Sequence, residues 1–178
     1  MDKITDFLNN EFKPLHVNDT VADAENLFLD FNYSHFPILE QDIYIGSIAK
    51  DDTEILPTSN PINEHKFNLH RFFVRSNMNW FDVFEEFSKN HTNILPVLDE
   101  KNQYIGFYEL DDVLHFLNET TFVKEDGGII VIEKETEDFT FSQICQIVES
   151  NGSKVLGVFV STTTPTLTQI TLKIYTNT

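Results

Sequence analysis

The sequence predicts an α+β protein made of an internal repeat followed by a separate C-terminal unit, and three observations indicate this. The stretch SHFPILEQDIYIGSIAKDD at residues 34–52 recurs as NILPVLDEKNQYIGFYELDD at residues 93–112. An amphipathic helical pattern precedes each stretch, at residues 20–31 and 79–90. After residue 126 the pattern changes and does not repeat again. A repeat of about sixty residues in two copies is typical of a paired module, not of a solenoid.

The first copy predicts a leading helix, an extended piece, a longer helix, a hairpin and a closing helix. Residues 4–8 have helical spacing, and residues 14–17 are extended after Pro14. Thr20 is expected to cap the next helix, with Asp23 completing a capping box. Its apolar face consists of Val21, Ala24, Leu27, Phe28 and Phe31. Strands follow at 36–39 and 43–48, and a short helix begins at 50–52, where acidic residues suit the helix dipole.

The second copy repeats this plan after a loosely patterned connection at residues 57–71. Asn79 is expected to cap a helix whose apolar face carries Trp80, Val83, Phe84 and Phe87. A hairpin with strands 95–98 and 104–108 and a closing helix at 111–118 complete the copy.

The C-terminal residues 126–178 predict a strand, a helix and two more strands. Residues 129–132 form an apolar run that suits a buried strand. Thr140 or Ser142 should cap a helix with Ile144, Ile147 and Val148 on its apolar face, ending near Asn151-Gly152. Strands are expected at 154–161 and 167–174. This order resembles the first two thirds of an ACT domain, which has a ferredoxin-like fold, although Phe139-Thr140-Phe141 replaces the usual Pro-Gly after Asp138.

The order of elements in residues 14–117 resembles two copies of the cystathionine-β-synthase (CBS) domain. Two such copies in tandem resemble a Bateman module. The resemblance implies two βαββα domains packed about a pseudo-twofold axis, at residues 1–60, including the leading helix, and 61–125. With the ACT-like unit, the chain is similar to acetoin-utilisation-type regulatory proteins. The resemblance implies a non-catalytic regulatory module whose clefts hold adenosine-type ligands and which reports binding to a regulated protein partner.

The resemblance also implies the ligand-binding residues. In ligand-binding members the second hairpin strand leads into the motif Gly-x-hydrophobic-Thr/Ser-x-x-Asp. The Asp of this motif accepts hydrogen bonds from the ribose hydroxyls, and its Thr or Ser side chain contacts phosphate. The aspartates match, but Ala49 and Glu109 replace the hydroxyl residue. The alternative for both aspartates is a favourable acid in a first helical turn. The expected ligand-binding residues are Asp52, Asp112, Lys50, Ile48, Tyr108 and His35.

The replacements restrict the expected ligand. A carboxylate at Glu109 facing a phosphate at 4 Å costs on the order of a few kcal/mol in a partly dry cleft. Lys50 is the nearby cation that could offset phosphate charge at the first copy. These residues favour adenosine, a singly phosphorylated species such as AMP, an adenosyl ligand without phosphate, or an empty site. No other cofactor is expected.

The charge disfavours two classes of partner. The formal net charge is -17, and residues 1–125 carry 23 acidic against 9 basic residues, a net of -14, whereas residues 126–178 carry 6 against 3, a net of -3. Such a field disfavours nucleic acid and anionic membranes. The start MDKITDFLNNEF predicts no signal peptide, and no apolar run approaches a membrane span. With a single cysteine, Cys145, the sequence predicts a cytoplasmic protein.

Catalysis and metal binding are not indicated. The sequence has no Gly-x-Ser-x-Gly motif and no phosphate-binding glycine loop, and its six histidines lack the spacing of a helical zinc site. An acidic cluster of Glu109, Asp111 and Asp112 is better explained as a solvated face than as a cation site.

The main hypothesis is therefore a regulatory sensor of an adenosine-type ligand. The rival hypothesis is a degenerate CBS pair that serves as an acidic protein-interaction scaffold. The incomplete C-terminal sheet exposes an open edge, so either the sequence is a fragment or a second copy completes the unit. We expect a homodimer.

Overall fold

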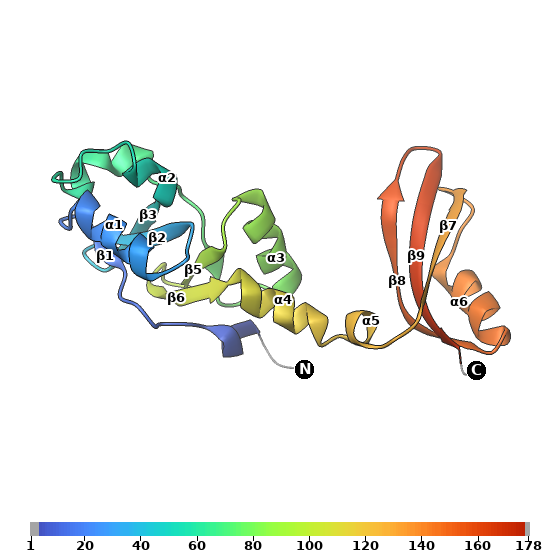
Figure 1. Ribbon diagram of the computed structural model, residues 1–178. Coiled ribbons are helices and arrows are strands. Elements are labelled where there is room, and N and C mark those ends of the chain that lie inside the picture. The colour runs from blue at the N-terminus through green and yellow to red at the C-terminus, as the bar shows by residue number, and fades with distance from the viewer. Residues whose placement is uncertain (1–3, 177–178) are drawn as a thin grey trace. The chain divides into compact units, whose positions relative to one another are not determined.

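The computed structural model describes residues 4–176, and the chain divides into two compact units after His115 (Figure 1). The first unit contains both repeats. Each repeat forms a three-stranded sheet, ordered β1-β2-β3 and β4-β5-β6, with a parallel first pair and an antiparallel hairpin. Its elements are η1 (Ile4–Phe7), β1 (Leu15–His16), α1 (Val21–Asp30), β2 (His35–Glu40), β3 (Ile43–Ala49), α2 (Lys50–Thr53), η2 (Ile62–Asn68), β4 (Val74–Arg75), α3 (Trp80–Lys89), β5 (Ile94–Leu98), β6 (Tyr104–Glu109) and α4 (Leu110–Asn118), the last of which crosses the division. The mixed α+β fold with two repeats is as predicted.

The helix caps follow the sequence. Thr20 caps α1 in a capping box, with its hydroxyl accepting from the Asp23 amide and the Asp23 carboxylate accepting from the Thr20 amide. The Asn79 side-chain oxygen accepts hydrogen bonds from the backbone amides of Phe81 and Asp82 at the start of α3. Such caps satisfy amide groups that have no partner within the helix. The leading segment is a single 3₁₀ turn, η1.

Each repeat has a core between its helix and its sheet. One cluster contains Phe28 of α1 and Phe36 of β2, and the other contains Val83 and Phe87 of α3. The first cluster also takes in Phe107 of the second repeat, whose ring stacks on Phe12 at a centroid distance of 4.5 Å. The repeats therefore share apolar contacts. One expectation is wrong: Phe84 lies at the border of the apolar face of α3 and is 38% exposed.

The segment that leads into each repeat crosses the last strand of the other repeat. Asn9 exchanges two backbone hydrogen bonds with Phe107 of β6, and His70 exchanges two with Ser47 of β3. A glycine lies beside each crossing, Gly106 with φ +145° and Gly46 with φ +149°. A Cβ on Gly106 would lie 2.6 Å from the Asn9 carbonyl oxygen, and one on Gly46 would lie 2.9 Å from the Leu69 Cβ. Glycine is required at both positions by its backbone conformation and by the crossing chain.

The second unit is a three-stranded antiparallel sheet with one long helix (Figure 1). The strand order β7-β9-β8 is the order of the first three strands in a ferredoxin-like fold, in agreement with the predicted partial unit. Ile144 of α6 packs on Ile170 and Leu172 of β9. The elements are α5 (Thr121–Lys124), β7 (Gly128–Glu135), α6 (Phe141–Ser150), β8 (Ser153–Thr163) and β9 (Leu167–Thr176). Thr140 is the N-cap of α6.

Two burial expectations for this unit are wrong. Ile129 and Val131 of β7 are 57% and 58% exposed, and Ile147 of α6 is 59% exposed. Because successive side chains of a strand point to opposite faces and α6 covers one face, a continuous apolar run leaves every second residue uncovered. The predicted domain boundaries at residues 60 and 125 stay predictions.

We expect Gly106→Ala to lower the free energy of unfolding of the first unit by about 2–4 kcal/mol, because the new Cβ clashes with backbone and the residue is strained. Thr20→Ala, which removes only an N-cap, should cost about 1 kcal/mol and serves as the comparison. Urea unfolding followed by circular dichroism measures both. Equal losses for the two variants would contradict the crossing constraint.

Candidate functional site

A cleft of about 740 Å³ lies between the two repeats, next to the start of α2. Its volume is within the range of about 300–1,000 Å³ that is usual for small-molecule sites. One wall comes from the end of β3 and α2, and the other from the chain that leads into β5. The lining residues are Asn32, Tyr33, Ser34, His35, Ala49, Lys50, Asp51, Asp52, His70, Lys89, Asn90, His91 and Asn93. We refer to it as the first cleft.

The walls are held together by the residues that precede β2 and β5. The Ser34 amide donates to the Asn93 side-chain oxygen at 2.8 Å, and the Asn93 side-chain amide donates to the Asn32 carbonyl at 2.8 Å. The Ser34 carbonyl accepts from the Lys50 amide, as the Asn93 carbonyl accepts from the Leu110 amide in the second repeat. The two backbone bonds hold each closing helix to its own repeat, and the Asn93 side chain joins the two repeats.

Two histidines meet at the wall of the first cleft. The His35 ring lies 3.2 Å from the His70 ring between Nε2 and Nδ1, and His70 Nε2 lies 3.4 Å from Asp52 Oδ2. His35 is 5% exposed and packs edge-on against Phe72. Burial, with the nearby His70, lowers the pKa of His35 to about 4, so the His35 ring is neutral at physiological pH.

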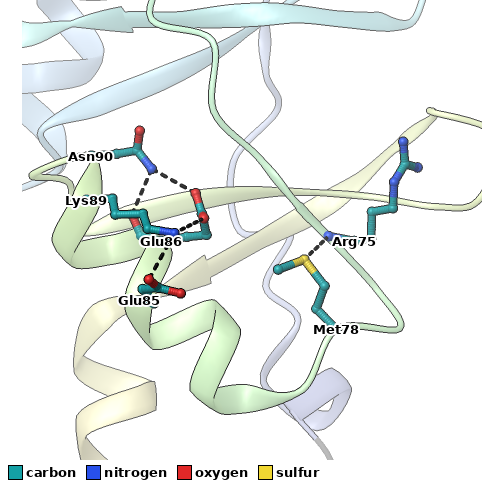
Figure 2. Close-up of polar contacts among 6 residues, drawn as sticks. All are labelled: Arg75, Met78, Glu85, Glu86, Lys89 and Asn90. Atoms are coloured by element: carbon teal, nitrogen blue, oxygen red, sulfur yellow. Dashed lines mark hydrogen bonds and ion pairs between the residues drawn. The ribbon is translucent and has the colours of Figure 1, made fainter.

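Two lysines, Lys50 and Lys89, line the first cleft. Lys89 is paired with Glu85 at 3.0 Å and Glu86 at 3.4 Å, and Figure 2 shows its ammonium group between these carboxylates. Asn90 donates to the Glu86 carbonyl at 2.8 Å in the same view. Within residues 4–176, Lys50 has no ion pair. Lys50 is thus the cation of the first cleft that is available to a ligand phosphate.

The equivalent cleft of the second repeat is smaller, about 300 Å³, and is partly filled by Glu109. The Glu109 carboxylate accepts from the Tyr33 hydroxyl at 2.5 Å and from the Asn9 side chain at 2.9 Å. Burial and this carboxylate raise the pKa of the Tyr33 hydroxyl. The lining residues are Asp30, Phe31, Asn32, Tyr33, Asn93, Glu109 and Asp111. A negative charge held at this place opposes an anionic ligand.

Three of the expected ligand-binding residues, Asp52, Lys50 and His35, lie together in the first cleft. Asp112 lies apart from them, in a shallow hollow beside Glu11. Burial and the charge of Glu109 raise the pKa of the Asp112 carboxyl.

Ile48 and Tyr108 lie in the apolar core, 1% and 0% exposed. Neither of these side chains is among the residues that line the two clefts.

Sequence reasoning missed His70, Ser34 and Asn93. His70 belongs to the loosely patterned connection, so no periodicity marked it. The alignment of the copies contained one usable signal, since Ser34 and Asn93 hold the same position before the first hairpin strand. Within residues 4–176 there is no cluster of three or more histidine, cysteine or acidic side chains placed to hold a metal ion. No helix in the same range has the length and apolar character needed to cross a membrane.

The stability of the fold should depend on pH through His35. The pKa of His35 is lowered in the folded protein. Between about pH 6.5 and about pH 4 the unfolded chain therefore binds a proton at His35 that the folded protein does not bind, and the free energy of unfolding decreases as the pH decreases. We expect His35 to account for a loss of about 2–3 kcal/mol between these limits. His35→Asn should lack this part of the loss, whereas the exposed His16→Gln should keep it. Denaturant unfolding at several pH values measures it, and equal slopes for all three proteins would contradict the assignment.

Comparisons with known proteins agree with this architecture. The family model of the CBS domain matches residues 4–52 and 54–119. A CBS domain pair/ACT domain protein from Thermotoga maritima has a TM-score of 0.60 at 20% identity, over 66% of this chain and 98% of that one. The CBS domains of a transcriptional regulator from Streptococcus pneumoniae give 0.57 at 21% identity, over 65% and 98%.

A third similar structure was solved with a nucleotide. The cytosolic domain of the Mg²⁺ channel MgtE in complex with ATP has a TM-score of 0.55 at 17% identity, over 65% of this chain and 48% of that one. A search of curated proteins finds no match.

Proposed function

The chain belongs to the CBS domain family, and we propose that its two repeats form a regulatory sensor that binds an adenosine-type ligand in the first cleft. The observation that carries this proposal is the difference between the two clefts. The first is open and brings Asp52 and Lys50 together, whereas Glu109 partly fills the second. One ligand for each chain is therefore expected.

The residues of the first cleft support a ligand with few phosphates. The Asp52 carboxylate can accept hydrogen bonds from the two vicinal hydroxyls of a ribose, which is the role that the CBS resemblance implies for it. Lys50 can offset one phosphate, but Asp51 lies beside it and Lys89 is neutralised by two glutamates. Adenosine and AMP fit this balance of charge better than the ATP bound to the MgtE domain.

Signalling would follow from the position of the cleft between the repeats. A ligand changes a conformation only if it binds one arrangement better than another. The first cleft has one wall from each repeat, and Asn93 joins the two walls. A bound ligand would thus favour one packing of the repeats, which a regulated protein partner in the cytoplasm could recognise. No catalytic step is part of this proposal.

A ligand titration tests the site. We expect adenosine and AMP to bind the purified chain, and saturation at a hundredfold over the dissociation constant should stabilise the fold by about 2.7 kcal/mol. Asp52→Ala should weaken binding about 10- to 100-fold because hydrogen bonds to a charged acceptor are lost. Asp112→Ala, the same change at the equivalent position, is the matched control and should bind as the unchanged protein does. Isothermal titration calorimetry and thermal shift measure both.

Other outcomes of the titration have defined meanings. Equal weakening by Asp52→Ala and Asp112→Ala would remove the assignment to the first cleft. No stabilisation by adenosine, AMP, ADP, ATP or S-adenosylmethionine would favour the acidic interaction scaffold, which the charge of -14 over residues 1–125 already makes a reasonable rival.

The second unit supports a homodimer. Among residues 4–176, both outer strands of the order β7-β9-β8 have one unpaired edge, and β7 carries Ile129 and Val131 on its uncovered face. Exposed edges of this kind pair readily with another strand. A second copy could pair along β7, which would place its apolar side chains beside Ile129 and Val131 on the same face.

We expect the chain to be a dimer and the double variant Ile129→Lys, Val131→Lys to be a monomer, because like charges would meet at the new interface. Ile55→Lys, at another exposed apolar side chain in the first unit, should leave the dimer intact. Light scattering coupled to size-exclusion chromatography measures the mass of each. A monomeric parent protein, or a dimer that survives the double change, would contradict this interface.

A further inference from the structure

A chain of hydrogen bonds links the second repeat to Asp52, and its proton positions can be assigned by counting donors. The Thr92 hydroxyl donates to the Ile94 carbonyl at 2.7 Å. A hydroxyl has one proton, so Thr92 cannot also donate to Ser34 Oγ, which lies 3.0 Å away. Ser34 is therefore the donor to Thr92.

The same count fixes the tautomer of His35. The Ser34 proton is committed to Thr92, so Ser34 Oγ can only accept from His35 Nδ1 at 2.8 Å. His35 carries its proton on Nδ1. Because burial and His70 lower the pKa of His35 to about 4, its Nε2 has no proton at physiological pH and is an acceptor.

His70 must then donate to His35. His70 Nδ1 lies 3.2 Å from His35 Nε2 and supplies the proton for this contact. A neutral His70 has only that proton, so its Nε2 lone pair faces the Asp52 carboxylate at 3.4 Å. Two acceptors then face each other. When Nε2 is protonated as well, His70 is a cation that donates to Asp52.

Charged and titratable groups from three elements line the cleft with His70. On α2 they are Lys50, Asp51 and Asp52, and His35 lies on β2. Across the cleft are Lys89, which is paired with two glutamates, and His91. The group in contact with His70 Nε2 is Asp52, at 3.4 Å from its Oδ2.

We propose that His70 is a proton-dependent positioning residue for Asp52. Neutral His70 leaves the Asp52 carboxylate free to accept hydrogen bonds from the ligand's hydroxyls, whereas protonated His70 donates a hydrogen bond to this carboxylate and holds it in place. This inference rests on the proposed binding of an adenosine-type ligand at Asp52. Because the Nδ1 proton is tied to the second repeat through His35, Ser34 and Thr92, His70 cannot turn to present that proton to Asp52 without breaking the chain. The state of Asp52 is thereby coupled to the contact between the repeats.

The first experiment needs no ligand. Nitrogen NMR of the imidazole rings at neutral pH distinguishes the two tautomers of His35 and His70. We expect Nδ1–H for both rings, although isolated neutral histidine favours Nε2–H. Ser34→Ala removes the acceptor of His35 and should lower the Nδ1–H fraction of both rings. An Nε2–H tautomer at His70 in the parent protein would overturn the proposal.

The second experiment measures binding of adenosine by calorimetry near pH 8 and near pH 6. Adenosine is the probe because it carries no phosphate that titrates in this range. We expect the affinity to fall severalfold toward the lower pH, since a protonated His70 competes for one oxygen of Asp52. His70→Ala should bind with equal affinity at both pH values. His91→Asn, at the other ring in the same cleft, should keep the difference between the two pH values.

The results separate this inference from the proposed function. Binding of adenosine that does not change with pH, or a pH dependence that survives in His70→Ala, would overturn the role of His70 and leave the ligand site standing. Absence of adenosine binding near pH 8 would overturn the adenosine site and its control by His70 together.

Discussion

The fold depends on two close crossings of backbone at Gly46 and Gly106. At each, the segment that leads into one repeat pairs with the last strand of the other, and no side chain fits between them. A glycine is needed at each for this reason as well as for its positive φ. The crossings turn two small sheets, neither with a large core of its own, into one unit with shared apolar contacts.

The same crossings account for the difference between the clefts. The crossing at β3 places His70 beside Asp52, and the crossing at β6 places Asn9 beside Glu109. In the first repeat the residue before the closing helix is Ala49, which leaves room, and in the second it is Glu109, which reaches Tyr33. Two repeats of the same topology thus carry an open cleft and a partly filled one.

Much of the fold could be predicted from local patterns. The capping residues Thr20 and Asn79, the hairpins and the succession of C-terminal elements depend on short-range spacing, and these predictions are confirmed. The errors concern burial. Phe84, Ile129 and Ile147 are apolar at the expected periodicity but exposed, because periodicity defines a face and not what covers it.

The sequence by itself determined that there are two equivalent repeats, each with an aspartate at the start of its closing helix, and that the first repeat has a lysine beside it. The tertiary structure decided which aspartate lies in an open cleft and what surrounds it. His70 lies eighteen positions after Asp52 in a segment without clear pattern. Glu109 and Tyr33 are 76 positions apart. Contacts over such separations depend on how the repeats cross, which no local pattern records.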